Sequence, residues 1–116
     1  MVRNRKEHNL QAICVRWFRL KYKPERAIIF AIPNGGSRNE REGANLKREG
    51  VTAGAPDLLI VHAGGTIFIE MKTEERGSRQ SQAQKEFQRV LEGLGKKYFV
   101  IRSFNEFMNV VNGEIL

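Results

Sequence analysis

The sequence has a single cysteine, Cys14, among 116 residues. This excludes an intrachain disulfide and a zinc site built from several cysteines. Cys14 falls at an apolar position of a predicted helix, where cysteine is more often a small core residue than a nucleophile. Because a chain without disulfides is typical of reducing compartments, we expect a cytoplasmic protein.

Long apolar runs are absent as well. No stretch of roughly 18 apolar residues is present, which argues against a membrane-spanning helix. The basic residues 1–8 lead into an amphipathic segment and lack the apolar stretch of a signal peptide. The two histidines, His8 and His62, lack the spacing of metal ligands and are expected at the surface or at a strand end. No Gly-Lys-Ser/Thr phosphate loop occurs, so an ATPase is not supported.

Acidic residues are outnumbered by basic ones. Twenty Lys and Arg against thirteen Asp and Glu give a net charge of +7 and a pI near 10.0. Such a surplus on a short chain favours a polyanionic partner, above all a nucleic acid. The charge is spread along the chain and not confined to one amphipathic helix, which argues against membrane binding. Charge alone does not distinguish this interpretation from a merely soluble basic protein.

The apolar pattern predicts one mixed α/β domain over residues 1–116. Helices are predicted at 5–21, 39–49 and 80–94 and after a capping box at 103–106, and strands at 27–32, 58–62, 66–72 and 98–102. The segment 73–79 is charged and predicted to be mobile. The predicted inward residues of the helices are Leu10, Ile13, Cys14, Trp17 and Phe18, then Ala83, Phe87, Val90, Leu91 and Leu94, then Phe104, Phe107, Met108 and Val111.

The third predicted strand carries the strongest functional signal. Side chains alternate across a strand, so one side carries Ile67, Ile69 and Met71 and the other Phe68, Glu70 and Lys72. Asp57 stands at the start of the preceding strand, directly after Gly54-Ala55-Pro56. In a tight hairpin, Asp57 and Glu70 pair at the same end. We therefore expect Asp57, Glu70 and Lys72 to converge.

Two carboxylates and a lysine suit phosphodiester hydrolysis. Carboxylate oxygens hold a hard cation such as Mg²⁺, which polarises a phosphate and activates a bound water. A nearby lysine orients that water or offsets charge on phosphorus. Each motif alone is common, because Glu-x-Lys is usually a solvated pair and Pro-Asp often only begins a strand. Their combination at hairpin spacing favours a metal-dependent nuclease.

Two further polar residues lie on apolar helix faces. Glu7 shares a face with Leu10 and Cys14, where a carboxylate needs a partner such as a metal or its water. The alternative is an acidic first-turn residue favoured by the helix dipole. Gln84 shares the face of Phe87, where its amide can bond the lysine or a phosphate, or can simply be exposed.

Basic residues cluster around these motifs. Because phosphate contacts fix position without reading sequence, the cluster predicts salt-dependent DNA binding with little base specificity. The alternative is a solvated charged loop. The residues are Arg38, Arg41, Lys47, Arg48, Arg76 and Arg79.

The ordered set of motifs resembles the VRR-NUC family of the PD-(D/E)xK nuclease superfamily. The motifs are Glu7, Pro33-Asn34-Gly35-Gly36, Gly54-Ala55-Pro56-Asp57-Leu58, Glu70-Met71-Lys72 and Gln84, and the likeness runs from Glu7 to about Val111. The resemblance implies a restriction-endonuclease-like fold in which a mixed four-stranded sheet is flanked by helices.

The same resemblance implies roles for single residues. Asp57, Glu70 and the backbone carbonyl of Met71 would bind Mg²⁺, or Mn²⁺ in its place, and Lys72 would be the catalytic lysine. Glu7 would bind a second metal or its water, Gln84 would support the site, and Asn34 matches a loop asparagine expected to contact DNA.

Stand-alone members of this size are phage and bacterial junction-resolving homodimers. The resemblance therefore implies a prokaryotic or phage-encoded endonuclease for branched DNA such as Holliday junctions. The competing hypotheses are a less selective nuclease and a non-catalytic nucleic-acid-binding module.

Overall fold

The computed structural model describes residues 5–33 and 40–115, with residues 40–42 as backbone only. Helices and strands follow one another in these ranges in the predicted order. The elements are α1 (Arg5–Lys21), β1 (Ala27–Ala31), α2 (Glu40–Arg48), β2 (Leu58–His62), β3 (Gly65–Met71), α3 (Gln82–Gly93), β4 (Lys97–Ile101) and α4 (Phe104–Ile115).

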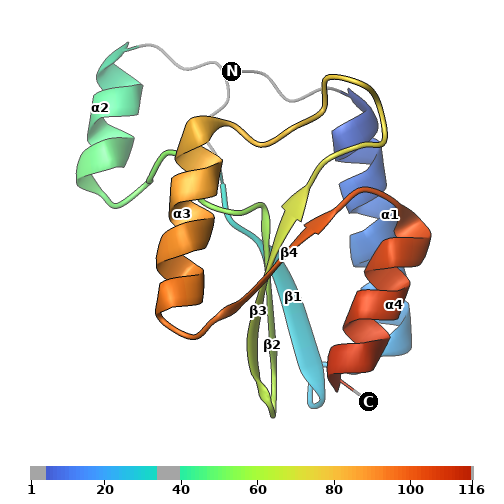
Figure 1. Ribbon diagram of the computed structural model, residues 1–116. Coiled ribbons are helices and arrows are strands. Elements are labelled where there is room, and N and C mark those ends of the chain that lie inside the picture. Colours follow the sequence, from blue (N-terminus) through green and yellow to red (C-terminus); the bar gives the residue numbers. More distant parts are fainter. Residues whose placement is uncertain (1–4, 34–39, 116) are drawn as a thin grey trace.

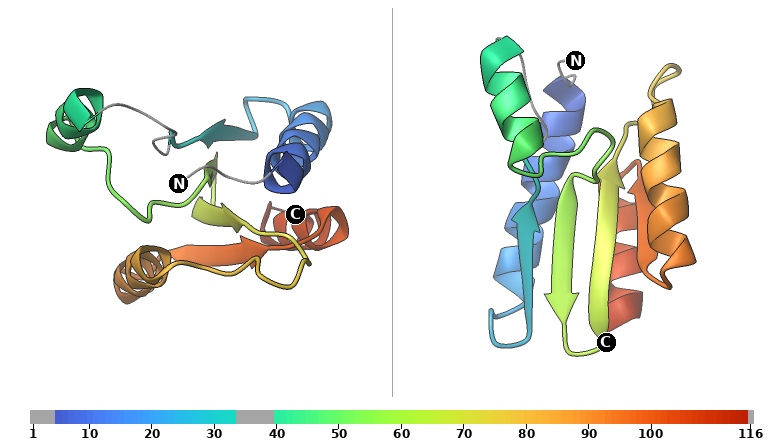
Figure 2. Two further views of the ribbon diagram at one scale, coloured as in Figure 1. Left: turned by 90° about the horizontal axis from the view of Figure 1, so that it is seen from above. Right: turned by 90° about the vertical axis from the view of Figure 1, so that its left-hand side faces the viewer.

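The strands form one mixed sheet in the order β1-β2-β3-β4. The β1–β2 and β2–β3 pairs are antiparallel, whereas β3 and β4 are parallel and are connected through α3. Helices α1 and α4 cover one face of the sheet, and α3 covers part of the other (Figures 1 and 2). The predicted sheet flanked by helices is therefore confirmed.

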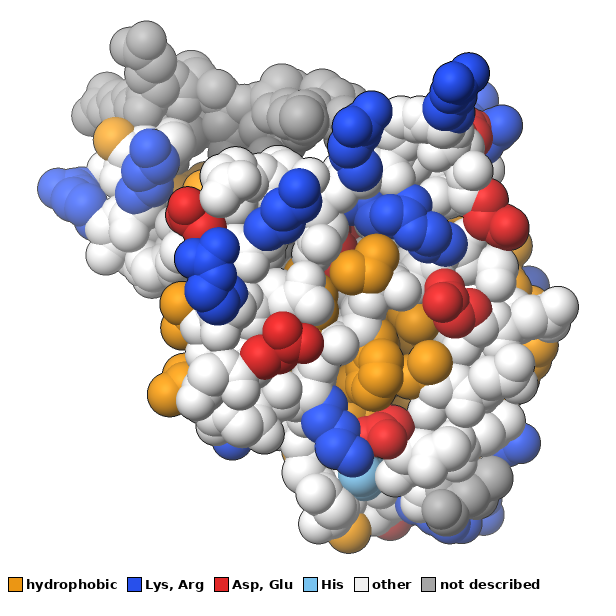
Figure 3. All heavy atoms as spheres, in the orientation of Figure 1, with side chains coloured by type: hydrophobic (Ala, Val, Ile, Leu, Met, Phe, Trp, Pro, Cys, Tyr) orange, Lys and Arg blue, Asp and Glu red, His pale blue; other side chains and the backbone are white. Residues whose placement is uncertain are grey.

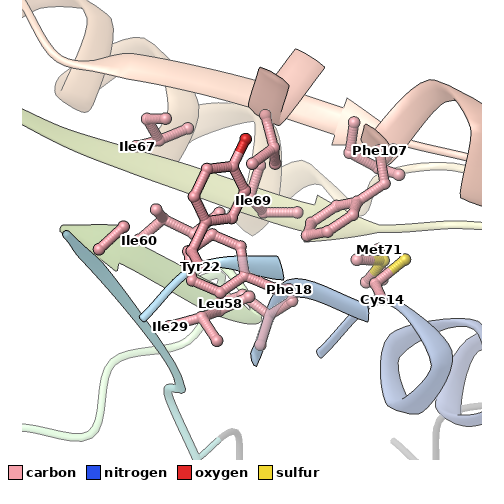
Figure 4. Close-up of a cluster of buried hydrophobic side chains, with 13 residues drawn as sticks. Cys14, Phe18, Tyr22, Ile29, Leu58, Ile60, Ile67, Ile69, Met71 and Phe107 are labelled. Carbon is pink, nitrogen blue, oxygen red and sulfur yellow. The ribbon is translucent and has the colours of Figure 1, made fainter. Parts of the chain in front are cut away.

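The core lies between the sheet and the α1–α4 layer (Figure 4). Ile67, Ile69 and Met71 are fully buried there, which confirms the predicted core face of β3. Fully burying such a side chain stabilises the fold by about 1.5–3 kcal/mol. The core residues are Cys14, Phe18, Tyr22, Ala27, Ile29, Leu58, Ile60, Ile67, Ile69, Met71, Ile101, Phe107 and Val111.

Cys14 is a core residue, as predicted. Its side chain is fully buried, and burial raises the pKa of its thiol to about 12. The thiolate is the nucleophilic form of cysteine, so Cys14 is chemically inert at neutral pH.

Helix α1 ends where predicted, because the residue before Pro24 is disfavoured in helical conformation. The ring of Trp17 meets Phe104 and Phe107 of α4 edge to face, with centroids 6.1 and 5.9 Å apart. This contact joins the two helices of the layer. The predicted inward position of Ile13 is wrong, since its side chain is 52% exposed.

Helix α3 buries less of its apolar stripe than predicted. Leu91 is buried, and Ala83 and Phe87 are half-buried. Val90 and Leu94 are exposed, at 61% and 68%, and their predicted inward positions are wrong. The reason is that a single helix covers this face, so no neighbouring helix encloses the sides of α3.

Helix α4 has a modified N-terminal cap. Ser103 Oγ accepts the N–H of Glu106 at 3.1 Å, as a capping box requires. The Glu106 carboxylate reaches back to the N–H of Arg102, at 2.6 Å, instead of that of Ser103. The inward stripe is as predicted, with Phe107 and Val111 buried and Phe104 and Met108 half-buried.

No helix in the described part of the chain is long and apolar enough to cross a membrane.

Candidate active site

Asp57 and Glu70 meet at one end of the β2–β3 hairpin. The register pairs Leu58 with Ile69, so the next position outward places Asp57 opposite Glu70. Because side chains alternate, both carboxylates point away from the core face that Leu58 and Ile69 occupy. They are only 4% and 1% exposed. The predicted pairing is thus present, and both groups are withdrawn from bulk water.

The backbone of Met71 lies beside Asp57. Asp57 Oδ2 accepts the N–H of Met71 at 2.7 Å. The N–H and C=O of one strand residue point to the same side, so the Met71 carbonyl also points toward β2 and Asp57. The Asp57 carbonyl in turn accepts the N–H of Ile32, which ties the start of β2 to the chain after β1.

Lys72 is held next to Glu70 just beyond the end of β3. Its Nζ lies 3.7 Å from Glu70 Oε2, and its side chain is 10% exposed. The N–H of Lys72 bonds to the Ile101 carbonyl of β4, which fixes the backbone that carries it. Burying a charge is costly unless it is paired, and this pair meets that requirement.

Gln84 joins α3 to the carboxylates. Its Nε2 donates to Glu70 Oε2 at 2.8 Å, and its Oε1 accepts the N–H of Ser81 at 2.8 Å. Ser81 Oγ accepts the N–H of Gln84, which completes a capping box. The two bonds fix which way the amide points. The interpretation of Gln84 as a simply exposed residue is therefore wrong.

Gly54 brings the loop before Asp57 against α3. It has a φ of +86°, and a Cβ at this position would lie 2.4 Å from the Ala83 carbonyl oxygen. Only glycine allows both this conformation and this close approach. The contact holds the loop that leads to Asp57 against the first turn of α3, which carries Gln84.

Glu7 is buried in the first turn of α1, with 8% exposure. Ser78 Oγ donates to its Oε2 at 3.4 Å. In residues 5–33 and 40–115, no three side chains of the Asp, Glu, His or Cys type are close enough to share a metal. Glu7 therefore does not join Asp57 and Glu70 as a third direct ligand in this arrangement.

Two solved structures share this architecture. One, called "VRR_NUC domain protein", is 28% identical and covers 98% of this chain and 91% of its own, with a TM-score of 0.75. Another, called "VRR_NUC domain", is 20% identical and covers 92% of this chain and 95% of its own, with a TM-score of 0.62. The chain is assigned to the VRR-NUC family. Comparisons of the sequence with family profiles and with curated proteins find no match.

The residues that this VRR-NUC chain brings together suit a hard divalent cation. Two carboxylates and the carbonyl of Met71 supply oxygen donors from adjacent strands, which is the ligand chemistry that Mg²⁺ and Mn²⁺ accept. Mg²⁺ usually keeps several waters, so two carboxylates are sufficient. The donor set therefore fits the metal that the resemblance implies.

Tyr98 also borders the carboxylates of this VRR-NUC site, although no pattern in the sequence pointed to it. Its hydroxyl accepts Gln80 Nε2 at 3.3 Å. Burial, followed by the negative charge of Glu70, raises the pKa of the Tyr98 phenol. The phenol therefore stays protonated at neutral pH.

Arg102 holds the loop that follows Lys72. Its Nη1 donates to the carbonyls of Thr73 and Ser78, at 2.8 and 2.6 Å, and the N–H of Thr73 donates to Ser78 Oγ. Lys6 adds an ion pair to Glu75 at 2.6 Å. These contacts tie Thr73, Glu75 and Ser78 to neighbouring elements, and the mobility of residues 73–79 stays a prediction. Arg102 was missed because its partners are backbone carbonyls distant in sequence.

The basic residues predicted to bind DNA are distributed around the site. Lys and Arg side chains gather over the upper part of the molecule in Figure 3, around α2, the start of α3, the loop before it and the start of α1. Lys47, Arg48, Arg76 and Arg79 are exposed there, and Arg41 lies in α2. Asn34 and Arg38 lie outside the described residues.

Neither histidine of the chain takes part in the site. His8 is exposed on α1, and His62 ends β2, where its Nδ1 accepts the N–H of Gly64 at 3.1 Å. Both positions match the surface or strand-end placement expected from the sequence.

Two variants separate the two functions of Gln84. Ser81→Ala removes the cap alone and should destabilise the fold by about 1 kcal/mol with little effect on metal binding. Gln84→Glu keeps a side chain that can cap but replaces the donor to Glu70 with a second carboxylate. We expect normal thermal stability with Mg²⁺ and a clear loss without it, because the added carboxylate repels Glu70 until a cation neutralises both. Melting curves with Mg²⁺ and with EDTA measure this, and equal losses in both buffers would contradict it.

Gly54→Ala should destabilise the protein by about 2–4 kcal/mol, because the added Cβ meets backbone and the residue must keep a positive φ. Gly43→Ala is the matched control, since a Cβ there meets nothing within 4 Å. Urea denaturation measures both variants. A Gly54→Ala protein as stable as the Gly43→Ala control would show that the loop does not approach α3 so closely.

Proposed function

We propose that the protein is a Mg²⁺-dependent endonuclease that hydrolyses DNA phosphodiester bonds, with branched DNA such as Holliday junctions as its substrate. The observation that carries this proposal is the pairing of Asp57 with Glu70, with Lys72 Nζ 3.7 Å from Glu70 Oε2. The assignment to the VRR-NUC family supports a nuclease.

Asp57, Glu70 and the Met71 carbonyl would hold the cation. When bound there, Mg²⁺, or Mn²⁺ in its place, would polarise a phosphate oxygen and lower the pKa of a coordinated water. Asp57 also fixes the Met71 peptide through its N–H, and Gln84 fixes one oxygen of Glu70. These bonds keep the donors in place before the substrate arrives, which lowers the cost of organising the site.

Lys72 supplies the positive charge that acts on the reacting phosphate. Its ammonium is nearly buried and positioned by Glu70, so it acts in surroundings with little water, where electrostatic interactions are strong. It would orient the attacking water or offset the charge that builds on phosphorus. Glu7, held by Ser78, would act on a second metal or through a water.

The basic surface would hold the phosphate backbone beside the site. Lys47 and Arg48 of α2 and Arg76 and Arg79 of the loop are exposed, as phosphate contacts must be. Arg38, Arg41 and Asn34 complete the proposed set. Binding by such contacts weakens steeply with salt and reads little sequence. The net charge of +7 supports the same partner.

A homodimer would match a four-way junction, whose two scissile strands are related by pseudo-twofold symmetry. Helix α4 is the surface we propose for the contact between copies. Within a prokaryotic or phage-infected cell, such an enzyme would act in the cytoplasm, where its DNA is. Sedimentation of active protein as a 13.3 kDa species alone would contradict the dimer.

The test is cleavage of labelled four-way junction, flap, linear duplex and single-stranded DNA with Mg²⁺ or with EDTA. We expect Mg²⁺-dependent cutting that is fastest on the junction. Equal rates on all four substrates would indicate a less selective nuclease. Tight binding without any metal-dependent cutting would contradict the proposal and favour a binding module.

A further inference from the structure

A groove of about 650 Å³ runs between α1 and β1, outside the residues assigned above to the site. Figure 2 shows β1 at the edge of the sheet with α1 alongside it. Phe30, 41% exposed, and Leu20, 78% exposed, are apolar parts of its wall. Arg16 and Arg19 are exposed along the α1 side of the groove. The described residues that line it include no acidic side chain.

One end of the groove opens beside β2 and β3, the strands of the two carboxylates Asp57 and Glu70. On the β1 side the lining ends at Ala31, and the next residue, Ile32, bonds to the Asp57 carbonyl at 2.9 Å. On the α1 side it ends at His8, the neighbour of the buried Glu7. A DNA strand that leaves the candidate site in this direction would therefore enter the groove.

The chemistry of the groove distinguishes between occupants. Exposed apolar and aromatic surface beside guanidinium groups suits a strand whose bases are free to stack and whose phosphates face the cations. A paired duplex presents its phosphates, but the flat faces of its bases are stacked on one another. Phe30 and Leu20 would therefore have no base surface to contact. An added peptide strand is disfavoured, because Arg19 Nη2 already bonds to the outward carbonyl of Ile29 at 3.2 Å.

From these observations we infer that the α1–β1 groove binds an unpaired DNA strand next to the scissile phosphate. The inference rests on the proposed nuclease function and adds a binding contact to it: DNA with an unpaired strand beside the scissile phosphate should bind more tightly than the same DNA without that strand. The groove follows α1 from His8 to Leu20, about 18 Å at about 1.5 Å per residue. At about 3.4 Å per stacked nucleotide, it accommodates roughly five nucleotides.

The test measures binding by fluorescence anisotropy in EDTA, so that no DNA is cut. The probes are duplexes with 5′ or 3′ single-stranded arms of increasing length. Wild-type affinity should rise with arm length for one polarity and level off near five nucleotides. Phe30→Thr keeps a strand-forming residue, and Arg16→Ala removes an exposed charge. In each variant, the increase in affinity that the arm provides should be about tenfold smaller than in wild type. The affinity of each variant for blunt duplex should stay within twofold of wild type.

Salt dependence separates the two contributions. Arg16→Ala should reduce the slope of log affinity against log salt by about 0.7 for the armed probe, the value for one phosphate contact on a single strand. Phe30→Thr should leave that slope unchanged. Lys96→Ala is the control and should change neither quantity, because Lys96 is an exposed lysine directly before β4 and does not line the groove.

Three results would overturn the inference: no gain from an arm, no effect of either variant, or equal losses on armed and blunt probes. Cleavage of the blunt four-way junction with Mg²⁺ is measured in parallel. Arm-dependent binding without any cleavage would contradict the proposed nuclease function but would still support the inference that the groove binds an unpaired strand. Cleavage without arm-dependent binding would contradict the groove alone.

Discussion

Glu70→Gln should lower the rate of Mg²⁺-dependent DNA cleavage about a thousandfold or more. Glu70 is 1% exposed and receives both the Gln84 amide and the Lys72 ammonium on Oε2. The substitution keeps shape and volume but removes the charge that would hold the cation. The cation's contribution of several kcal/mol to the transition state is then lost, and about 4 kcal/mol corresponds to a thousandfold.

DNA binding should survive this substitution. Removing a carboxylate near the phosphates reduces repulsion, so affinity for uncut DNA in EDTA should stay the same or rise. Single-turnover cleavage and anisotropy on the same preparations measure both effects. Glu86→Gln, an exposed carboxylate on α3, is the matched control. Glu70→Gln protein that cuts at the rate of this control would contradict the assigned role.

Lys72→Met should lower the cleavage rate about a hundred- to a thousandfold, with divalent-cation affinity unchanged or higher. The methionine fills the nearly buried position of the lysine stem, but no ammonium faces the reacting phosphate. The carboxylates that hold the cation remain. This split between rate and metal binding distinguishes Lys72 from Glu70, for which both should fall.

The fold should survive Lys72→Met when the metal is present. Without metal, Glu70 loses its buried cationic partner, so the apo protein should be destabilised by about 1–3 kcal/mol. Calorimetric Mn²⁺ titration and single-turnover cleavage give the two quantities, with the exposed Lys85→Ala as control. Full activity in Lys72→Met would remove the catalytic role, and loss of metal binding would make Lys72 a structural part of the site.

The meeting of Asp57 and Glu70 was predictable for two reasons. The direction of side chains along a strand repeats every two residues, and a short hairpin fixes the register of its two strands. Leu58 pairs with Ile69, and one further step determines the carboxylate pair. Register is specified strongly here because a one-residue slip would bring Glu70 into the core. The same rule predicted that Glu70 and Lys72 share a face, as they do at 3.7 Å.

Other features depend on tertiary surroundings that a sequence pattern does not encode. The exposed Val90 and Leu94 continue a good helical stripe, but periodicity does not state how much of a stripe the sheet covers. Arg102 holds backbone carbonyls of a loop that precedes it by more than twenty residues, and any exposed arginine has the same local pattern.

The capping box of α3 was missed, although its pattern is present in the sequence. Ser81-Gln82-Ala83-Gln84 has the Ser-x-x-Gln spacing of a capping box, and this spacing predicts where α3 begins. It also fixes the amide of Gln84, and hence the contact with Glu70. A local signal of helix capping therefore carried information about the candidate site.

The central claim is that the Asp57–Glu70 pair is a divalent-cation site. The measurement that tests it most directly is calorimetric titration of Mn²⁺ into wild type, Glu70→Gln and the Glu86→Gln control, without DNA. The structure predicts saturable binding by wild type and control and at least a tenfold loss of affinity in Glu70→Gln. Equal affinity in all three proteins would contradict the claim and place any bound cation elsewhere on the molecule.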